Sequence, residues 1–207
     1  MTMLLDEQEM QLGAGEAQTL GNAMTWVQAR LRNTDKIVVK VEVAGQVLDG
    51  PALDANHALQ LEGREVAFST ASRVKLTHSM LGKLAALVDF LGQQHPHIAG
   101  LLEKGETAKA MELLGGALSA WGQIHEGFRS LTQLLQISLD ELMVGERPAS
   151  ELIAEFKTQL EEVGAAIQKR DLVLLADILQ YEMDRAVENW KALLAAVLGV
   201  VGVEGIE

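Results

Sequence analysis

Apolar residues recur at three- and four-residue steps through the C-terminal two-thirds of the chain, which is the spacing of helices that bury one face. Three stripes of this kind precede the last helix. The first consists of Leu81, Leu84, Leu87, Val88 and Leu91. The second consists of Met111, Leu114, Leu118, Trp121, His125, Phe128, Leu131 and Leu135. The third consists of Leu152, Phe156, Leu160, Val163 and Ile167. We predict that Pro96 ends or kinks the first helix, and that Pro148 lies just inside the start of the third.

The last helix, from Asp171 to Val201, is apolar on more than one face. Its main line consists of Leu172, Leu175, Leu179, Met183, Ala186, Trp190, Leu193 and Val197. Beside it, Leu174, Ile178 and Tyr181 are separated by four and three residues and form a second ridge. A helix in a small bundle needs one buried stripe, so we predict that this second ridge is a partner interface.

The first 70 residues have the pattern of short strands around one helix. Met3-Leu4-Leu5 and Met10-Gln11-Leu12 flank a polar segment and predict a hairpin. Thr19 is the expected N-cap of a helix that reaches about Arg32. Residues 37–43 alternate as a strand does, Ala44-Gly45 predicts a turn into residues 46–48, and residues 65–70 predict a last strand. The residues from Asp49 onward read as a loop, and no strand is predicted after residue 72.

The order hairpin, helix, hairpin, strand is that of a β-grasp module. Short connections between the later helices favour antiparallel neighbours. We therefore predict an α+β protein, in which a small N-terminal β-grasp-like module (residues 1–70) precedes an antiparallel helical bundle of about four helices (residues 72–201). Residues 202–207 are predicted to be a flexible tail. Trp121 and Trp190 are expected to be buried between the bundle helices.

Composition and charge narrow the possible partners. The chain has 48% hydrophobic and 22% charged residues, as folded proteins do, and a formal net charge of −12. Such a charge opposes binding to nucleic acid or to an anionic membrane. The acidic N-terminus does not resemble a secretory signal, and the apolar run Leu193–Val203 is shorter than the about 20 residues that cross a bilayer. The sequence also has no cysteine. We expect a cytoplasmic protein.

The sequence offers few groups for chemistry. His95 and His97, with His78 or His125 as a third ligand, could hold a metal, but His-Pro-His at a helix break is usually a solvated turn. His125 falls on an apolar stripe and is interpreted as a hydrogen-bonded core residue. Gly13-Ala14-Gly15 lacks the third glycine of a dinucleotide-binding loop, and no catalytic serine motif is present. We therefore predict no catalytic residue, no cofactor and no metal site.

Residues 174–184, Leu-Leu-Ala-Asp-Ile-Leu-Gln-Tyr-Glu-Met-Asp, are followed by Trp190. This succession resembles the C-terminal helical region of uncharacterised bacterial proteins, a resemblance that implies a bacterial source and no activity. The acidic helical bundle is also similar in texture to flagellar export chaperones, by analogy of fold alone.

These patterns lead to a non-enzymatic hypothesis. We expect an adaptor or chaperone-like protein that binds a partner protein segment through the helical bundle, using Leu174, Ile178 and Tyr181. The alternative is a structural protein that uses its surplus apolar surface for a homo-oligomer, most simply a homodimer. A third alternative is a ligand- or metal-binding protein that uses His95, His97 and His125.

Overall fold

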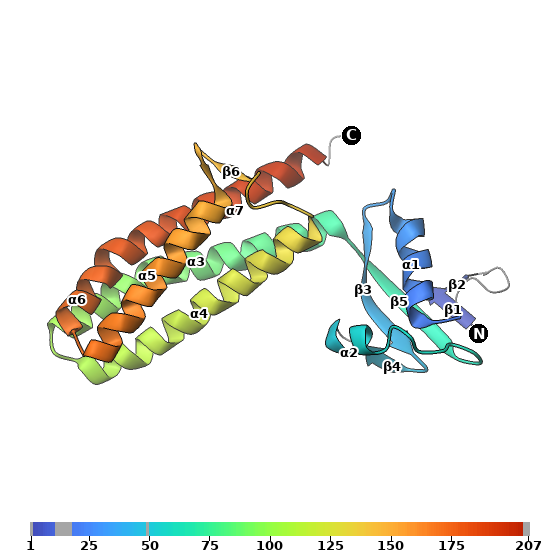
Figure 1. The fold of residues 1–207 in the computed structure, drawn as a ribbon, viewed down its shortest axis with the longest axis horizontal. Helices are drawn as coiled ribbons and strands as arrows, with labels where there is room; N and C mark the ends of the chain where they lie inside the picture. The colour runs from blue at the N-terminus through green and yellow to red at the C-terminus, as the bar shows by residue number, and fades with distance from the viewer. Residues whose placement is uncertain (1, 11–17, 49, 205–207) are drawn as a thin grey trace. The chain divides into compact units, whose positions relative to one another are not determined.

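The computed structural model describes residues 2–10, 18–48 and 50–204, and the chain divides into two compact units between Leu76 and Thr77. The protein is of mixed α+β class, with an N-terminal sheet and a C-terminal helical bundle. Figure 1 labels the elements of both units. The predicted boundary at residues 70–72 falls at the junction of β5 and α3, slightly before this division. No helix of the described residues is both long and apolar enough to cross a membrane.

The N-terminal unit is a five-stranded mixed sheet with one main helix. Its elements are β1 (Thr2–Leu5), β2 (Gln8–Met10), α1 (Leu20–Leu31), β3 (Lys36–Val43), β4 (Gln46–Leu48), α2 (Gly50–Ala55) and β5 (Glu65–Ser72). The strand order is β2-β1-β5-β3-β4, and β1 runs parallel to β5 while the other neighbours are antiparallel. Alternate strand residues, Met3, Val41, Val43, Val66 and Phe68, join the buried residues of α1 in one core.

Tight turns and a cap set the limits of these elements. The Thr19 hydroxyl accepts a hydrogen bond from the Asn22 backbone N–H at 3.2 Å, which confirms the predicted N-cap of α1. Ala44 and Gly45 both have positive φ, as a two-residue hairpin turn requires. Asp6 also turns with positive φ, and its carboxylate accepts hydrogen bonds from the backbone and the hydroxyl of Thr70.

Two predictions for this unit need correction. The strand β2 starts at Gln8 rather than at Met10, because the turn needs only two residues; residues 11–17 lie outside the described part of the chain. The predicted loop after Asp49 contains the short helix α2. Leu53 of this helix packs on the core, and the side-chain amide of Asn56 donates to the Ala52 carbonyl at 2.7 Å. These two contacts stabilise a helical turn that the local sequence pattern does not predict.

The helical unit contains three long helices and a segmented last one. The elements are α3 (Arg73–Glu103), α4 (Thr107–Leu134), β6 (Met143–Val144), β7 (Arg147–Pro148), α5 (Ala149–Lys169), α6 (Leu172–Asp177), the π-helix η1 (Ile178–Glu182) and α7 (Met183–Glu204). In Figure 1 the long helices lie side by side along their length. The Asp171 carboxylate accepts the Leu174 N–H at 3.0 Å, so Asp171 caps the last helix as predicted.

Pro96 does not end α3, so the predicted alternative of a helix that stops there is wrong. The helix continues for two more turns, to Glu103, past a proline whose side chain is exposed. A proline inside a helix costs about 3 kcal/mol because one hydrogen bond is lost and its ring crowds the preceding turn. Burial of Leu91, Ile98 and Ala99 on either side of Pro96 offsets this cost.

Other boundaries also differ from the prediction. The helix α4 ends at Leu134, one residue before the end of its predicted stripe, because Gln136 adopts a left-handed conformation. A small hairpin, β6–β7, then turns at Gly145, although no strand was predicted there. Pro148 is the N-cap of α5 rather than a residue of its first turn. The predicted tail begins too early, since α7 reaches Glu204; residues 205–207 lie outside the described residues.

Aromatic rings from three helices form the centre of the bundle. Trp190 of α7 meets Phe128 of α4 edge-on at 5.3 Å and Phe156 of α5 edge-on at 5.4 Å. Trp121 of α4 lies 4.6 Å from Phe156 and 6.1 Å from Trp190, between ring centroids. Both tryptophans are 1% exposed, which confirms their predicted burial.

His95 of α3 completes this cluster. Its Nε2 accepts a hydrogen bond from the Trp121 indole N–H at 3.1 Å, so the neutral ring carries its proton on Nδ1. Burial lowers the pKa of His95 from 6.5 to about 4. The predicted solvated turn at residues 95–97 is therefore wrong for His95, because α3 continues and places this ring in the core.

Replacing Trp190 with alanine should destabilise the helical unit strongly. Removal of a fully buried indole leaves a cavity among Trp121, Phe128 and Phe156, and such changes cost about 3–5 kcal/mol. Urea unfolding followed by circular dichroism at 222 nm measures the loss. The exposed Tyr181→Ala variant is the control, and equal losses for both variants would contradict the assigned packing.

Stability should fall with acid through the titration of His95. The folded pKa is about 4 and the unfolded one is 6.5, so only the unfolded state binds the proton between these values. Stability is thus complete above pH 6.5 and decreases as pH falls toward 4, by on the order of 3 kcal/mol. Urea titrations of wild type and His95→Phe at pH 7.5, 5.5 and 4.5 test this. If the free energy of unfolding of His95→Phe falls between pH 7.5 and 4.5 as much as that of the wild type, groups other than His95 cause the pH dependence.

Candidate functional site

The predicted ridge of Leu174, Ile178 and Tyr181 is not one surface. Leu174 and Tyr181 are 43% and 67% exposed, but Ile178 is only 5% exposed and belongs to the bundle core. The prediction of a continuous exposed ridge is therefore wrong at its central residue.

The π-helix η1 is the physical reason. The Met183 backbone N–H donates to the Ile178 carbonyl, five residues earlier, so this turn is wider than a regular turn. Sequence periodicity assumes 3.6 residues per turn and places Tyr181 below Ile178 on one face. The wider turn instead places Met183 next below Ile178, and both are buried. Tyr181 is thereby displaced from the face of Ile178 and is exposed.

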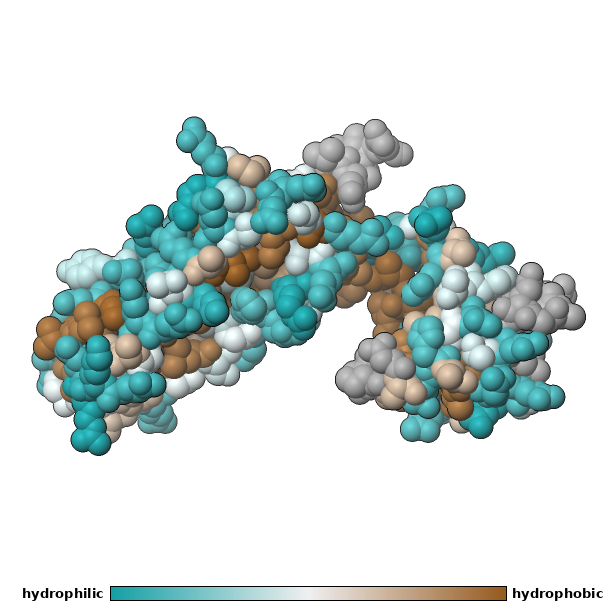
Figure 2. Space-filling model, in the orientation of Figure 1, coloured by the Kyte–Doolittle hydropathy of each residue, from teal (hydrophilic) through white to brown (hydrophobic). Residues whose placement is uncertain are grey.

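What is left of the predicted interface is an apolar patch at one end of the bundle. Val173 is 75% exposed and joins Leu174 and Tyr181 on the same helical segment. Figure 2 shows apolar surface at the end of the helical unit that α6 occupies. The patch contains only three described apolar side chains, so it is a weaker candidate than the groove described next.

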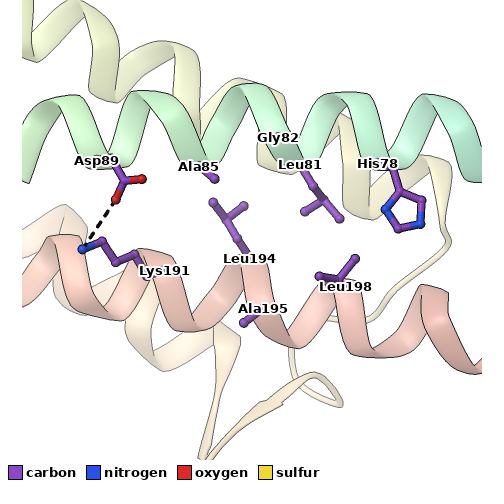
Figure 3. Close-up of a pocket in the computed structure, with 9 residues that line it drawn as sticks. All are labelled: His78, Leu81, Gly82, Ala85, Asp89, Lys191, Leu194, Ala195 and Leu198. Atoms are coloured by element: carbon purple, nitrogen blue, oxygen red, sulfur yellow. Dashed lines mark ion pairs between the residues drawn. The ribbon is translucent and has the colours of Figure 1, made fainter.

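A groove of about 510 Å³ lies between α3 and α7 (Figure 3). We call it the α3–α7 groove. Its lining is His78, Leu81, Gly82, Ala85 and Asp89 from α3, and Lys191, Leu194, Ala195 and Leu198 from α7. Five of these nine residues are apolar and one is glycine, so the groove is mainly an apolar surface.

The two walls of the groove run antiparallel. A β-carbon at Gly92 of α3 would lie 3.3 Å from the Val187 side chain of α7, so the helices are closely packed just beyond the groove. The next pair along both helices, Asp89 and Lys191, forms an ion pair. A β-carbon at Gly82 would meet no atom within 4 Å. The small residues Gly82, Ala85 and Ala195 therefore leave the groove open, while Leu198 of α7 is a large exposed side chain at its edge.

Charge is confined to the ends of the groove. The Lys191 ammonium lies 3.6 Å from the Asp89 carboxylate and donates a hydrogen bond to Glu188 at 2.9 Å. The hydrogen bond with Glu188 raises the pKa of Lys191, which therefore remains protonated. His78 lies at the opposite end of the groove (Figure 3). The apolar floor between these ends contains no titratable side chain among its lining residues.

The histidines proposed as metal ligands do not come together. His78 lines the groove, His95 is in the core, and His97 and His125 are exposed. His125 was predicted to be a core residue, but the buried position belongs to its neighbour Ile124. The described residues include no group of three or more His, Cys, Asp or Glu that could hold a metal ion. Gly13-Ala14-Gly15 lies outside the described residues.

The groove was not predicted from the sequence, because apolar periodicity identifies the buried face of each helix but not which helices pack together or what lies between them. The available signal was the run from Leu193 to Val203, which is apolar around the whole helix. Leu198 in this run is 44% exposed, although its neighbour Val197 is fully buried. An apolar residue out of phase with the buried stripe thus marked the outer face of α7.

A family model described as a domain of unknown function, DUF8042, matches residues 79–193, which is more than half of the chain. The protein belongs to the DUF8042 family. The DUF8042 match covers the helical unit from Ser79 in α3 to Leu193 in α7, including the ion pair of Asp89 with Lys191. No curated protein matches the chain, and no solved structure matches it.

Because Ile178 is buried, a charge at this position should affect folding rather than partner binding. Ile178→Asp places a carboxylate in the DUF8042 bundle core and should lower the free energy of unfolding by more than about 3 kcal/mol. Tyr181→Asp, in the same π-helix but exposed, should change it by less than about 1 kcal/mol. Chemical denaturation of both variants decides the point. Near-equal stabilities would mean that the regular helical phase, and not the π-helix, describes this segment.

Proposed function

We propose that this protein is a non-enzymatic interaction protein, and that its helical unit binds a helical segment of a protein in the α3–α7 groove. The observation that carries the proposal is an open apolar groove of about 510 Å³ along two packed helices. Soluble proteins keep few such hollows, and they mark binding sites more often than other surfaces do.

The dimensions of the groove suit a helix. The α3 wall extends from His78 to Asp89, which corresponds to three helical turns or roughly 16 Å. Helices pack with their axes about 8–10 Å apart, and small residues at the contact allow the closer values. Gly82, Ala85 and Ala195 provide such residues on both walls. An amphipathic helix that places its apolar face in this groove is an established mode of protein recognition.

The same lining argues against catalysis in the groove. Its titratable members are His78, Asp89 and Lys191. Asp89 and Lys191 neutralise each other at one end, while His78 lies at the other (Figure 3). General acid–base or nucleophilic catalysis needs partner groups within hydrogen-bond reach of each other. This separation supports a binding role.

Charge supports proteins as the partners, in a cytoplasmic setting. The net charge of −12 repels nucleic acid phosphates and anionic lipid headgroups. The proposal therefore retains the expectation of an adaptor or chaperone-like protein, and moves the main interface from Leu174, Ile178 and Tyr181 to the α3–α7 groove.

We also infer the finer architecture of both units. The strand order β2-β1-β5-β3-β4, with β1 parallel to β5 and α1 between the two hairpins, supports a β-grasp module. The short connections between α3 and α4 and between α5 and α6, together with the uninterrupted run of α6, η1 and α7, support an antiparallel bundle in which this run is the fourth helix.

A photo-crosslinking amino acid tests the proposed function. Benzoylphenylalanine at position 85 points into the groove, whereas at position 86 it occupies an exposed site on the same helix outside the lining. Irradiation of the full chain in cells of the source organism should give protein adducts from position 85 and about tenfold fewer from position 86. Mass spectrometry should map each adduct to a helical segment. Absence of any protein adduct from position 85 would refute the binding role.

A further inference from the structure

We infer that the occupant of the α3–α7 groove is a second copy of this chain, packed as a symmetric dimer whose two-fold axis runs along the groove. This inference rests on the protein-binding role proposed for the groove and names the partner; here the second copy presents its own groove, with its α3 and α7, in place of a single helix. Three observations carry it: the charge of the groove compared with the rest of the unit, the antiparallel match of its two walls, and the arrangement of small and large residues.

The groove is an electrically neutral surface on an acidic protein. Residues 77–207 contain 19 Asp and Glu against 10 Lys and Arg. Two copies of such a unit repel each other across most of their surfaces. In the groove lining, however, the charged residues are Asp89 and Lys191, whose charges cancel, although Glu188 beside the lining also binds the Lys191 ammonium. A basic partner would bind most favourably to the acidic surfaces outside the groove. A second copy of this acidic protein, in contrast, avoids like-charge repulsion only where the surface is neutral.

The antiparallel walls make the groove complementary to itself. A two-fold axis along the groove keeps each residue at its own level and exchanges the two walls, so α3 of one copy faces α7 of the other. Asp89 then faces Lys191 of the second copy, and Lys191 faces the second Asp89. The side chains are 64% and 44% exposed, so both are available for these contacts. Four charges of alternating sign result, which is a favourable arrangement at an interface.

The apolar residues match at the same levels. Leu198 of α7 is 44% exposed and lies opposite the region of Gly82 on α3 (Figure 3). In the dimer, Leu198 of each copy enters the space that Gly82 and Ala85 leave open on the other copy. The four helices, two from each copy, thus enclose the two facing grooves and bury their lining in one shared core.

A charge exchange tests this arrangement directly. In light scattering with analytical ultracentrifugation, the wild type should have twice the chain mass of 22.4 kDa. Asp89→Lys and Lys191→Asp each place like charges opposite one another in a homodimer, and each should weaken dimerisation by at least about tenfold. Mixing the two variants places opposite charges in both pairs and should restore the dimer. Asp184→Lys, an exposed change of the same size outside the groove, should leave the mass unchanged.

Each outcome has a definite meaning. A wild type that is monomeric up to about 500 μM overturns the inference, and so does a dimer that neither single variant weakens or that mixing fails to restore. Circular dichroism and melting temperature must match the wild type for each variant. If a charge variant fails to fold, Ala85→Glu replaces it, with the neighbouring Ala86→Glu as control. The former should be monomeric and the latter dimeric, and equal masses for both would overturn the inference.

Crosslinking separates this inference from the proposed function. Adducts that join position 85 to a second copy of this protein support the dimer. Adducts from that position only to another protein overturn the dimer and leave the binding role intact. Absence of adducts from position 85 removes both.

Discussion

The burial of Trp190 determines how the last helix is rotated within the bundle. Its indole is held edge-on by Phe128 and Phe156, and Trp121 packs beside it from α4. These rings come from different helices, so Trp190 cannot move without opening several contacts at once. Lys191 follows Trp190 directly, and Ala195 and Leu198 follow within two turns. The orientation of Trp190 therefore directs these residues outward beside α3, and the groove is a consequence of how the core is packed.

The core also explains why a buried histidine and a helical proline occur in sequence. His95 accepts the indole N–H of Trp121, which would otherwise be buried without a partner. Pro96 follows on the exposed side of α3, where its missing N–H is offset by the apolar residues around it. The Trp121 hydrogen bond thus joins α4 to α3, and the ring contacts of Trp121 with Phe156 and Trp190 join α4 to α5 and α7.

Periodicity alone predicted much of the architecture. Local patterns account for the strands predicted at residues 37–43, 46–48 and 65–70, the caps at Thr19 and Asp171, and the burial of both tryptophans. These features depend on residues close in sequence or on one helical face. The prediction failed where a distant contact decides the conformation. The helix α2 depends on packing of Leu53 on the sheet, and the continuity of α3 depends on burial around Pro96.

The candidate site was less accessible to prediction for the same reason. A groove is defined by two helices that are about 100 residues apart in the chain, and its open part lies where Gly82, Ala85 and Ala195 are small. Single-sequence patterns give no pairing between such segments. The predicted ridge at residues 174–181 does not form because the π-helix η1 changes the helical phase of the residues that follow Ile178. The amino-acid composition of this segment gives no sign of that wide turn.

That wide turn has a consequence for changes in chain length. The step from Ile178 to Met183 contains one residue more than a regular helical step, and both ends of it face the core. Loss of one residue from η1 would leave a regular four-residue step between Ile178 and Met183. The apolar residues before and after η1 would then still face the core. The same loss within α4 would rotate every later side chain on that helix by about 100° and remove Phe128 from the core. The π-helix η1 is therefore a place where this chain can lose one residue without repacking its interior.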